Sequence, residues 1–346
     1  MPKISRLSKL KTKLINWEYW PFSILYFPVF FYFGWLTIRA RSVFFFTASN
    51  PSIDFGGMFG ERKSEIFDIV PDKYLPVTEL IEEGNFESAR QKAKAIGYPL
   101  IAKPDIGERG IWVSKVNTEM ELETYAQECP VDFLLQELVS FPVELGVFYV
   151  KYPGKMGQVT SIVRKEFLTV RGDGKSTILQ LLENSTRAVL TADLSSDFLR
   201  EKGNNVPEKG KEVLIEPIGN HCRGTKFLND ETEIDDRLTN AICQIADEIP
   251  DFYFGRFDLK CNSLDDLRDL KNFKILELNG AGSEPGHIYQ PGYSLVRAYK
   301  DILWHLRVLA DISILNHKRG IPYWSFKAGY QKWTSHKKHN RLLYKK

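Results

Sequence analysis

The pattern of hydrophobic and polar positions predicts short helices interleaved with strands. Helical spacing of apolar residues predicts helices over 86–96, ended by Gly97, over 233–249 and over 295–309, and Thr118 opens another helix. The shorter expected elements are helices at 64–68 and 177–183, a polar helical insert at 185–210, and strands at 43–46, 99–103, 111–116, 133–137, 145–151, 158–170, 252–260 and 273–278. Hairpins interleaved with helices favour an α+β fold over a doubly wound parallel sheet.

The segment from Tyr19 to Ile38 contains no charged residue, and half of its side chains are aromatic. It matches the ~20 residues with which a helix spans a bilayer, but Pro21, Pro28 and Gly34 interrupt a helix. Basic residues flank the segment on both sides, so no inside face is indicated. Since Tyr and Trp prefer the headgroup level, monotopic or re-entrant membrane contact is favoured. A true span, and an aromatic helix buried in the protein or in an oligomer contact, remain alternatives.

Composition and charge further limit the class of protein to which the chain can belong. The 346 residues are 43% hydrophobic and 26% charged, which is typical of a globular protein with a real core. A net charge of +3 is too balanced to indicate nucleic-acid binding. Both ends are basic, and no acidic residue follows Asp311, so the C-terminal tail is expected to attract anionic lipid or simply to be solvated. Four scattered cysteines and the lack of a signal-peptide pattern favour a cytoplasmic location.

The first candidate motif joins a lysine to a glycine-bearing turn. Lys103 ends an apolar strand, and the turn from Gly107 to Gly110 follows it. Backbone N–H groups of such a turn can hold phosphate oxygens while the lysine adds positive charge. A hairpin with a surface lysine is the alternative interpretation.

Two glutamates follow on the next strands. Glu137 ends one strand, and Glu144 comes seven residues later on the following strand. They could meet an adenine amino group and a ribose hydroxyl. Taken alone, two edge carboxylates are the favoured interpretation.

The strongest signal lies on two strands near the C-terminal third. Residues at i and i+2 of a strand face the same side, so Arg256 and Asp258 share one face, as do Glu277 and Asn279. If the strands pair, carboxylate and amide oxygens gather beside an arginine, and such oxygens are the ligands that Mg²⁺ prefers. Because these polar pairs interrupt apolar strands, the pattern favours a function over a merely structural sheet.

A second glycine-bearing loop, Arg171–Ser176, separates a strand from a helix. Its Gly174-Lys175-Ser176 end resembles the last part of a P-loop, but Thr169 stands where that motif needs its first glycine. The sequence therefore argues against a P-loop NTPase. A mobile lid over phosphates is the remaining interpretation of this loop.

Together and in this order, the four motifs resemble the ATP-grasp superfamily of carboxylate–amine ligases, above all the D-alanine–D-alanine ligases and the cyanophycin-synthetase-like ligases. The resemblance covers residues 73–290. It implies two α+β lobes that clasp a nucleotide, preceded here by the aromatic N-terminal segment, which we expect to associate with a membrane.

The resemblance also implies roles for the motif residues. Lys103 would hold the α- and β-phosphates beneath a flap formed by Gly107–Gly110. Glu137 and the backbone near Val139 would meet adenine, Glu144 would meet the ribose, and Lys175 would belong to the loop that closes over the phosphates and the substrate. Two Mg²⁺ ions, bridged by Glu277, and the transferring phosphoryl group would be held by the strand residues Arg256, Asp258, Glu277 and Asn279.

The activity implied by the resemblance is that of an Mg-ATP-dependent ligase, which activates a carboxylate as an acyl phosphate and joins it to an amine. A catalytically silent ATP-binding scaffold and an ATP-grasp phosphotransferase are the alternatives. The expected partners are small-molecule, peptide-linked or lipid-linked acids and amines, and the surface of the inner membrane. Nucleic acid is not expected, and a homodimer is left open.

We expect four regions along the chain. They are a basic and aromatic membrane-associating segment at 1–41, a reduced N-terminal lobe at 42–97, the ATP-grasp domain at 98–310, and a basic aromatic tail at 311–346. Within the ATP-grasp domain, the lid lobe would cover about 98–140 and the catalytic lobe about 141–310.

Two departures from the family pattern leave candidates open. The N-terminal stretch is shorter than the complete α/β lobe with which D-alanine ligases begin, so the carboxylate pocket has no obvious source. The upstream phosphate lysine has no clear match, with Lys73 as the first candidate and Lys63 as the second. Candidates for the substrate pocket, with ordinary loop or surface roles as the alternative, are His221, His287, Arg171 and Arg223.

Overall fold

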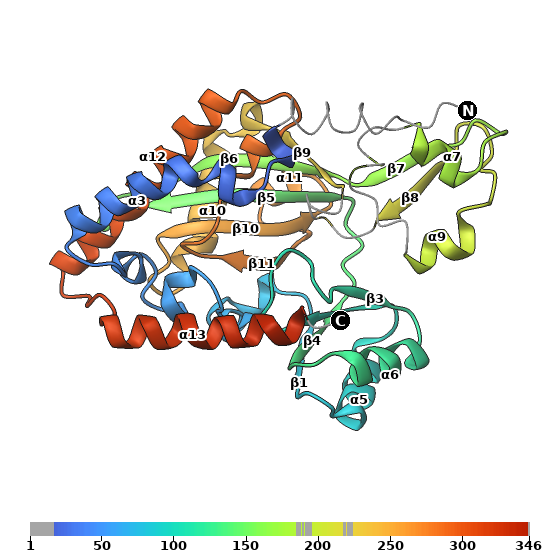
Figure 1. Cartoon of the computed structure of the whole chain (residues 1–346), viewed down its shortest axis with the longest axis horizontal. Helices are drawn as coiled ribbons and strands as arrows, with labels where there is room; N and C mark the ends of the chain where they lie inside the picture. Colours follow the sequence, from blue (N-terminus) through green and yellow to red (C-terminus); the bar gives the residue numbers. More distant parts are fainter. Residues whose placement is uncertain are drawn as a thin grey trace.

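The structure, a computed structural model, describes residues 17–184, 188, 190, 196–216, 219 and 224–344. A large lobe built on a five-stranded sheet lies above a smaller lobe built on a four-stranded sheet, and a two-stranded unit projects from the side of the large lobe (Figure 1). The expected α+β architecture of two lobes is confirmed.

The large sheet forms the centre of the molecule. Along its strand β5 (Val143–Lys151), Val147 and Tyr149 pack in the core that contains helix α10 (Asp236–Asp247), whereas Phe148 and Val150 pack in the core that contains α12 (Leu295–Lys318). Both faces of the sheet are therefore buried. The strand order, antiparallel throughout, is β11 (Phe273–Asn279), β10 (Phe254–Cys261), β5, β6 (Gly157–Glu166) and β9 (Lys226–Asn229).

The small lobe carries its helices on one face of its sheet. Helix α5 (Phe86–Ile96) has the predicted bounds, with Asn85 accepting a hydrogen bond from the Ser88 amide at its start and Gly97 at a φ of 92° at its end. Because β1 and α5 belong to this layer, the boundary expected at residue 97 runs through the small lobe. Its other elements are β1 (Thr78–Ile81), β4 (Phe133–Glu137), β2 (Leu100–Pro104), β3 (Ser114–Val116) and α6 (Glu119–Glu128).

The long strand expected over 158–170 is two strands in different sheets. β6 ends at Glu166, and β7 (Leu168–Arg171) pairs instead with β8 (Glu212–Glu216) in the projecting unit (Figure 1). This unit also holds α7 (Ile178–Glu183), which matches the helix expected at 177–183 and is capped by Thr177, and α9 (Asp197–Lys202). The helical insert expected at 185–210 lies partly outside the described residues.

The aromatic N-terminal segment packs on the large lobe as a helix. Helix α2 (Phe22–Leu25) leads into α3 (Phe27–Ala40), which runs beside α12 (Figure 1). Pro28 lies in the first turn of α3, where a missing N–H costs little, and Gly34 is accommodated inside the helix. Across the described residues, we find no helix with the length and apolar character needed to cross a membrane.

The strand expected at 43–46 is wrong. Residues Phe45–Ala48 form a 3₁₀ turn, and the rings of Phe45 and Phe46 are buried against Phe33 and against each other. An apolar run signals burial but does not distinguish a strand from a turn that is enclosed on all sides.

The segment expected as a basic aromatic tail at 311–346 is helical over most of its described length. Helix α12 continues to Lys318, and a further helix, α13 (Phe326–Leu343), runs below the large sheet to the small lobe (Figure 1). Ser325 caps it, accepting a hydrogen bond from the Ala328 amide at 3.2 Å. Leu343, only 4% exposed, joins the hydrophobic core of the small lobe. The basic composition of this segment does not indicate a packed helix, because buried positions such as Leu343 are few and widely spaced along it.

Candidate functional site

The two polar strands pair as predicted. β10 and β11 are antiparallel neighbours, with Asp258 opposite Glu277 and Arg256 opposite Asn279. The amide of Asn279 donates to Asp258 Oδ2 at 3.0 Å, and a register irregularity follows Asp258. The register therefore brings all four side chains together on one face of the sheet.

Asp258 is buried among cations. Arg256 Nη2 lies 2.9 Å from Asp258 Oδ2, and Lys165 Nζ lies 3.3 Å from Oδ1. Burial by itself would raise the pKa of Asp258, but the two cations outweigh it and hold the pKa below its usual value. On the neighbouring strand, a Cβ at Gly146 would come within 3.2 Å of Asp258 Oδ1, so a glycine keeps space open beside the carboxylate.

Lys103 links the small lobe to this centre. Its ammonium donates to Gln136 Oε1 and to the carbonyl of Leu276, both at 3.0 Å, and Leu276 immediately precedes Glu277 on β11. Burial lowers the pKa of Lys103 to about 8, although the nearby Glu277 opposes the shift. The ammonium group of Lys103 therefore lies beside the strand that carries Glu277.

Of the two upstream lysines, the structure brings the less favoured one to the site. Lys63, the first residue of α4 (Lys63–Ile69), has its ammonium 3.4 Å from Glu277 Oε1 and donates to the carbonyl of Gly107 at 2.6 Å. Lys73 instead pairs with Glu248 at 2.6 Å, and its side chain is 59% exposed. The preference for Lys73 over Lys63 as the upstream lysine of the site is therefore wrong. The spacing of residues along the sequence does not reveal which of the two segments lies next to β11.

The glycine-bearing flap is held by the C-terminal helix. His339 Nε2 lies 3.0 Å from the carbonyl of Ile106, and the indole of Trp112 donates to the carbonyl of Leu343 at 3.0 Å. A Cβ at Gly107 would meet Pro104 at 3.2 Å and Leu343 at 3.8 Å. Gly110, at a φ of 73°, closes the turn. Nothing local in the sequence points to this contact.

Glu61 is a site residue that the sequence analysis missed. Its Oε2 is buried and has no hydrogen-bond partner among the described residues. Burial raises its pKa, and the charges of Lys63, which lowers the pKa, and of Glu277, which raises it, act on the same carboxylate. A buried carboxylate oxygen without a partner is costly, and a bound cation or a donor of a substrate would satisfy it.

The residues expected to meet adenine and the ribose lie in different surroundings in the structure. Glu144 is buried and meets the centre through Lys165 at 3.0 Å, and Lys260 at 3.8 Å from Glu144 donates to the carbonyl of Val139. Glu137 lies at the end of β4, where its carboxylate accepts a hydrogen bond from the Val77 amide at 3.2 Å. Glu144 and Val139 thus belong to one network with Asp258, whereas Glu137 binds the Val77 amide instead.

Lys175 lies on the projecting β7–β8 unit and is exposed. The loop around it is ordered by Asp173, whose Oδ1 accepts from the amides of Ser176 and Lys175 at 2.6 and 2.8 Å. These hydrogen bonds, that from Ser176 first, lower the pKa of Asp173 to about 2. Among the contacts of the described residues, Lys175 makes none with the Asp258 centre, so its role in closing over phosphates stays a prediction.

The loop after β11 adds a carboxylate that the sequence analysis did not single out. Glu284 accepts hydrogen bonds from the hydroxyls of Tyr26 and Tyr289, and its carbonyl accepts from Arg256 Nη1 at 3.2 Å. Burial raises the pKa of Glu284 to about 7. Tyr26 comes from the N-terminal aromatic segment, so only the folded chain brings these groups together.

The structure describes two of the four histidine and arginine candidates for the substrate pocket. His287 is buried, with Nδ1 2.7 Å from Ser161 Oγ and Nε2 3.3 Å from Asp301 Oδ2, so it braces the loop that carries Glu284. Arg171 is exposed at the end of β7. His221 and Arg223 lie outside the described residues.

The charge balance of the enclosed centre suits a polyphosphate with divalent cations. Basic side chains outnumber the carboxylates, which favours an anionic ligand. Within the described part of the chain, no three His, Cys, Asp or Glu side chains are grouped as a ready-made metal site. The donor set is therefore two carboxylates and an amide, with the orphaned oxygen of Glu61 nearby, and hard oxygen donors of this kind fit Mg²⁺ held jointly with phosphate oxygens. The centre comprises Lys63, Lys103, Lys165, Arg256, Lys260, Glu61, Glu144, Asp258, Glu277 and Asn279.

Comparison with known proteins was made by sequence and by structure. No family model and no curated protein matches the chain. Solved structures that match include the D-Ala:D-Ser ligase VanG of Enterococcus faecalis, with 16% identity, 72% of this chain and 61% of that chain covered, and a TM-score of 0.43. The D-alanine–D-alanine ligase of Bacillus anthracis matches with 14% identity, 75% and 69% coverage, and a TM-score of 0.40. A bifunctional glutathione synthetase of Pasteurella multocida matches with 14% identity, 70% and 35% coverage, and a TM-score of 0.37.

These three structures are ligases and a synthetase, and the chain spans between 35% and 69% of their lengths. Further matches include a protein described as an ATP-grasp ligase, PsnB. The features of this chain that agree with the ATP-grasp resemblance of its sequence are two α+β lobes, a lysine of the small lobe touching β11, and the paired polar faces of β10 and β11.

Proposed function

We propose that this protein is an Mg-ATP-dependent ligase that activates a carboxylate as an acyl phosphate and joins it to an amine. The observation that supports this most is the meeting of Lys103 with the strand that carries Glu277, directly opposite Asp258. One enclosed centre thereby combines oxygen donors for metal with cations for phosphate. The specific activity of a D-alanine–D-alanine ligase is one member of this class.

The described side chains have distinct tasks in this proposal. Lys103 and Lys63 neutralise the phosphates of ATP, and Arg256 stabilises charge on the transferring phosphoryl group. Asp258, Glu277 and Asn279 would hold two Mg²⁺ ions, which supply charge neutralisation on the phosphate oxygens when bound. The flap from Gly107 to Gly110 excludes water, which would otherwise hydrolyse an acyl phosphate.

Glu284, in the loop beside this centre, is the carboxylate best suited to hold the attacking amine. Its described partners are two neutral tyrosine hydroxyls and a contact of its own carbonyl with Arg256. A buried carboxylate without a counter-ion favours a cationic ligand, and an ammonium group would supply the missing charge. A pKa raised by burial also suits a base that accepts a proton from the amine near neutral pH.

We also propose that the enzyme works in the cytoplasm, peripherally attached to the inner face of a membrane. ATP as phosphoryl donor suits the cytoplasm, and the uncharged face of α3 suits the bilayer interface. Small-molecule, peptide-linked or lipid-linked acids and amines remain the substrates that we propose.

The test is ADP release over a panel of carboxylates and amines, with wild type, Asp258→Asn and Glu277→Gln. We expect both variants to lose about 10²-fold or more, because each removes charge that stabilises the phosphoryl group in transfer. Asp265→Asn, an exposed carboxylate of the same lobe, is the matched control and should keep wild-type turnover.

Three outcomes would count against the proposal. Unchanged ATP turnover in both site variants would overturn the assignment of these residues. Nucleotide binding without turnover across the panel would favour a silent scaffold. A phosphorylated acceptor that accumulates without any amine would favour a phosphotransferase.

A further inference from the structure

One face of α3 carries large apolar side chains into solvent. Spacings of four, four and three residues place the exposed members along one side of the helix, and the opposite side is buried against α12 through Leu36 and Val29. The exposed side chains, with their exposed fractions, are Phe27 (62%), Phe31 (69%), Trp35 (51%) and Ile38 (77%). A contiguous apolar surface of this kind marks an interaction site.

A basic hollow lies at the end of this apolar face. Its volume is about 350 Å³, and it lies between the C-terminal ends of α3 and α12. The ring of His317 stacks on Tyr323 at 3.9 Å, and His317 Nδ1 lies 2.9 Å from the carbonyl of Ile321, so one wall is fixed. The hollow is lined by Arg39, Ala40, Arg41, Ile314, His317, Lys318 and Tyr323.

The charged residues that line the hollow are all basic. Arg39 is partly neutralised, because Asp311 lies 2.5 Å from its guanidinium. Arg41 and Lys318 are exposed and extend the positive charge to the rim. The hollow therefore favours a compact anion, and the apolar face beside it favours a hydrocarbon environment.

We infer that this surface docks on an anionic bilayer, with the apolar face of α3 in the interface and the phosphate headgroup of a lipid in the hollow. Free phosphate would satisfy the hollow but not the neighbouring face. A second copy of the chain would bring the same positive hollow toward its own image in an isologous contact. Only a lipid surface offers the anion and the hydrocarbon side by side.

The inference rests on the membrane attachment proposed above and not on the ligase chemistry. It also agrees with the sequence that precedes the described residues, where five Lys or Arg side chains come before the first acid, Glu18. Helix α3 begins next to Tyr26, which contacts Glu284 beside the Asp258 centre, and its C-terminal end, where the hollow lies, points away from the small lobe (Figure 1).

The experiment is co-sedimentation of the full chain with vesicles of phosphatidylcholine alone and with added phosphatidylglycerol. We expect binding to be stronger on the anionic vesicles and to weaken with salt. Arg41→Gln and Lys318→Gln should each weaken binding to anionic vesicles about fivefold and leave binding to neutral vesicles unchanged. Trp35→Ser and Phe31→Ser should weaken binding to both kinds of vesicle about tenfold or more.

Matched controls separate surface chemistry from general effects. Met120→Ser removes an apolar side chain that is 75% exposed on α6, and Lys115→Gln removes an exposed charge on β3. Both should bind like wild type. Excess inorganic phosphate should not displace the protein from vesicles, which distinguishes a lipid site from a free-phosphate site.

The outcomes are distinguishable. Equal binding of wild type to both vesicles, or no effect of the Arg41 and Lys318 variants, would overturn the headgroup site while membrane attachment stands. No binding to either vesicle would overturn both, and so would a solution dimer that Phe31→Ser dissociates. ADP release by Arg41→Gln in solution should equal that of wild type, so failure of docking does not imply failure of the ligase proposal.

Discussion

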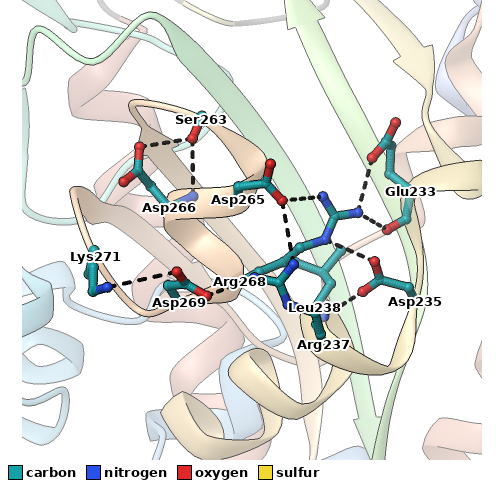
Figure 2. A network of polar contacts seen from close by, with 10 residues as sticks. All are labelled: Glu233, Asp235, Arg237, Leu238, Ser263, Asp265, Asp266, Arg268, Asp269 and Lys271. Atoms are coloured by element: carbon teal, nitrogen blue, oxygen red, sulfur yellow. Dashed lines mark hydrogen bonds and ion pairs between the residues drawn. The ribbon is translucent and has the colours of Figure 1, made fainter.

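Arg268 and Asp258 each stand at the centre of a polar network, but one network faces water and the other is enclosed. Arg268 reaches Glu233, Asp235 and Asp265 at 3.1, 2.9 and 3.3 Å (Figure 2). These three carboxylates have side chains that are 40%, 46% and 77% exposed, although the side chain of Arg268 itself is 12% exposed. The Asp258 side chain is 7% exposed, as is that of Glu144, and Lys165 beside them is 8% exposed.

The sign of the charge differs as well. Acidic residues are in excess in the first network, where water and salt can complete their solvation. Basic residues are in excess in the second network, where burial removes that possibility. The two networks therefore differ in charge balance and in the burial of the carboxylates closest to their central residue, and we propose that the second of them is the ligand site. The charged residues of the first network are Glu233, Asp235, Asp265, Asp266, Asp269, Arg237, Arg268 and Lys271 (Figure 2).

The largest expected effect concerns α13, which closes the enclosed centre from one side. Leu343→Ala removes a buried anchor of the small lobe and should lower the free energy of unfolding by about 2–4 kcal/mol. The neighbouring Leu342→Ala, at a side chain that is 39% exposed, is the control and should change it by less than about 1 kcal/mol. Thermal and denaturant unfolding would measure both. Equal losses would contradict the anchoring of α13 in the small lobe.

The second largest effect is expected on nucleotide affinity, where substitutions of Lys63 and Lys73 should differ. Lys63→Met should weaken nucleotide binding about 10- to 100-fold, because it removes a charge-assisted contact beside Glu277. Lys73→Met, which breaks a largely exposed pair with Glu248, should leave the affinity within about twofold. Calorimetric titration with a non-hydrolysable ATP analogue would distinguish them. The account of the centre fails if the order of the two effects is reversed.

A pH dependence should follow from the burial of Lys103. Its ammonium is charged below a pKa of about 8 and neutral above it, so phosphate affinity is present at low pH and lost as the pH rises through that value. For a single group, the affinity at pH 9 should be about tenfold weaker than at pH 7. Lys103→Arg keeps its charge and should lose the pH dependence. A flat profile in wild type would contradict the role of Lys103.

The smallest effect is expected in the exposed network. Arg268→Ala should cost about 1 kcal/mol of stability, because three solvated ion pairs are lost together. Nucleotide affinity should not change. A loss of nucleotide binding in this variant would erase the distinction between the two networks.

Much of this centre could be predicted from sequence because its signal is local. The i, i+2 spacing of Arg256 and Asp258 on an apolar strand needs only the strand period, and pairing of the two strands follows from their proximity along the chain. Helix α5 was predictable for the same reason, since its periodicity and both its ends lie within the segment.

The remaining features depend on contacts between distant segments. Lys63 meets Glu277 across more than two hundred residues, and Tyr26 meets Glu284 across a similar span. No pattern in either segment signals its partner. For this reason the sequence did not indicate that Lys63, and not Lys73, lies beside Glu277. Helix α13 was hidden because its buried positions, Gly329 and Leu343, are few and widely spaced in a largely basic segment.

The central claim is that Asp258, Glu277 and Asn279 hold divalent cations for a bound nucleotide. The most direct measurement is calorimetric titration of the full chain with a non-hydrolysable ATP analogue, with and without Mg²⁺, in wild type and in Glu277→Gln. We predict that Mg²⁺ strengthens binding to wild type at least about tenfold and that Glu277→Gln abolishes this gain while remaining folded. Affinity that is independent of Mg²⁺ in wild type, or an equal gain in the variant, would contradict the claim.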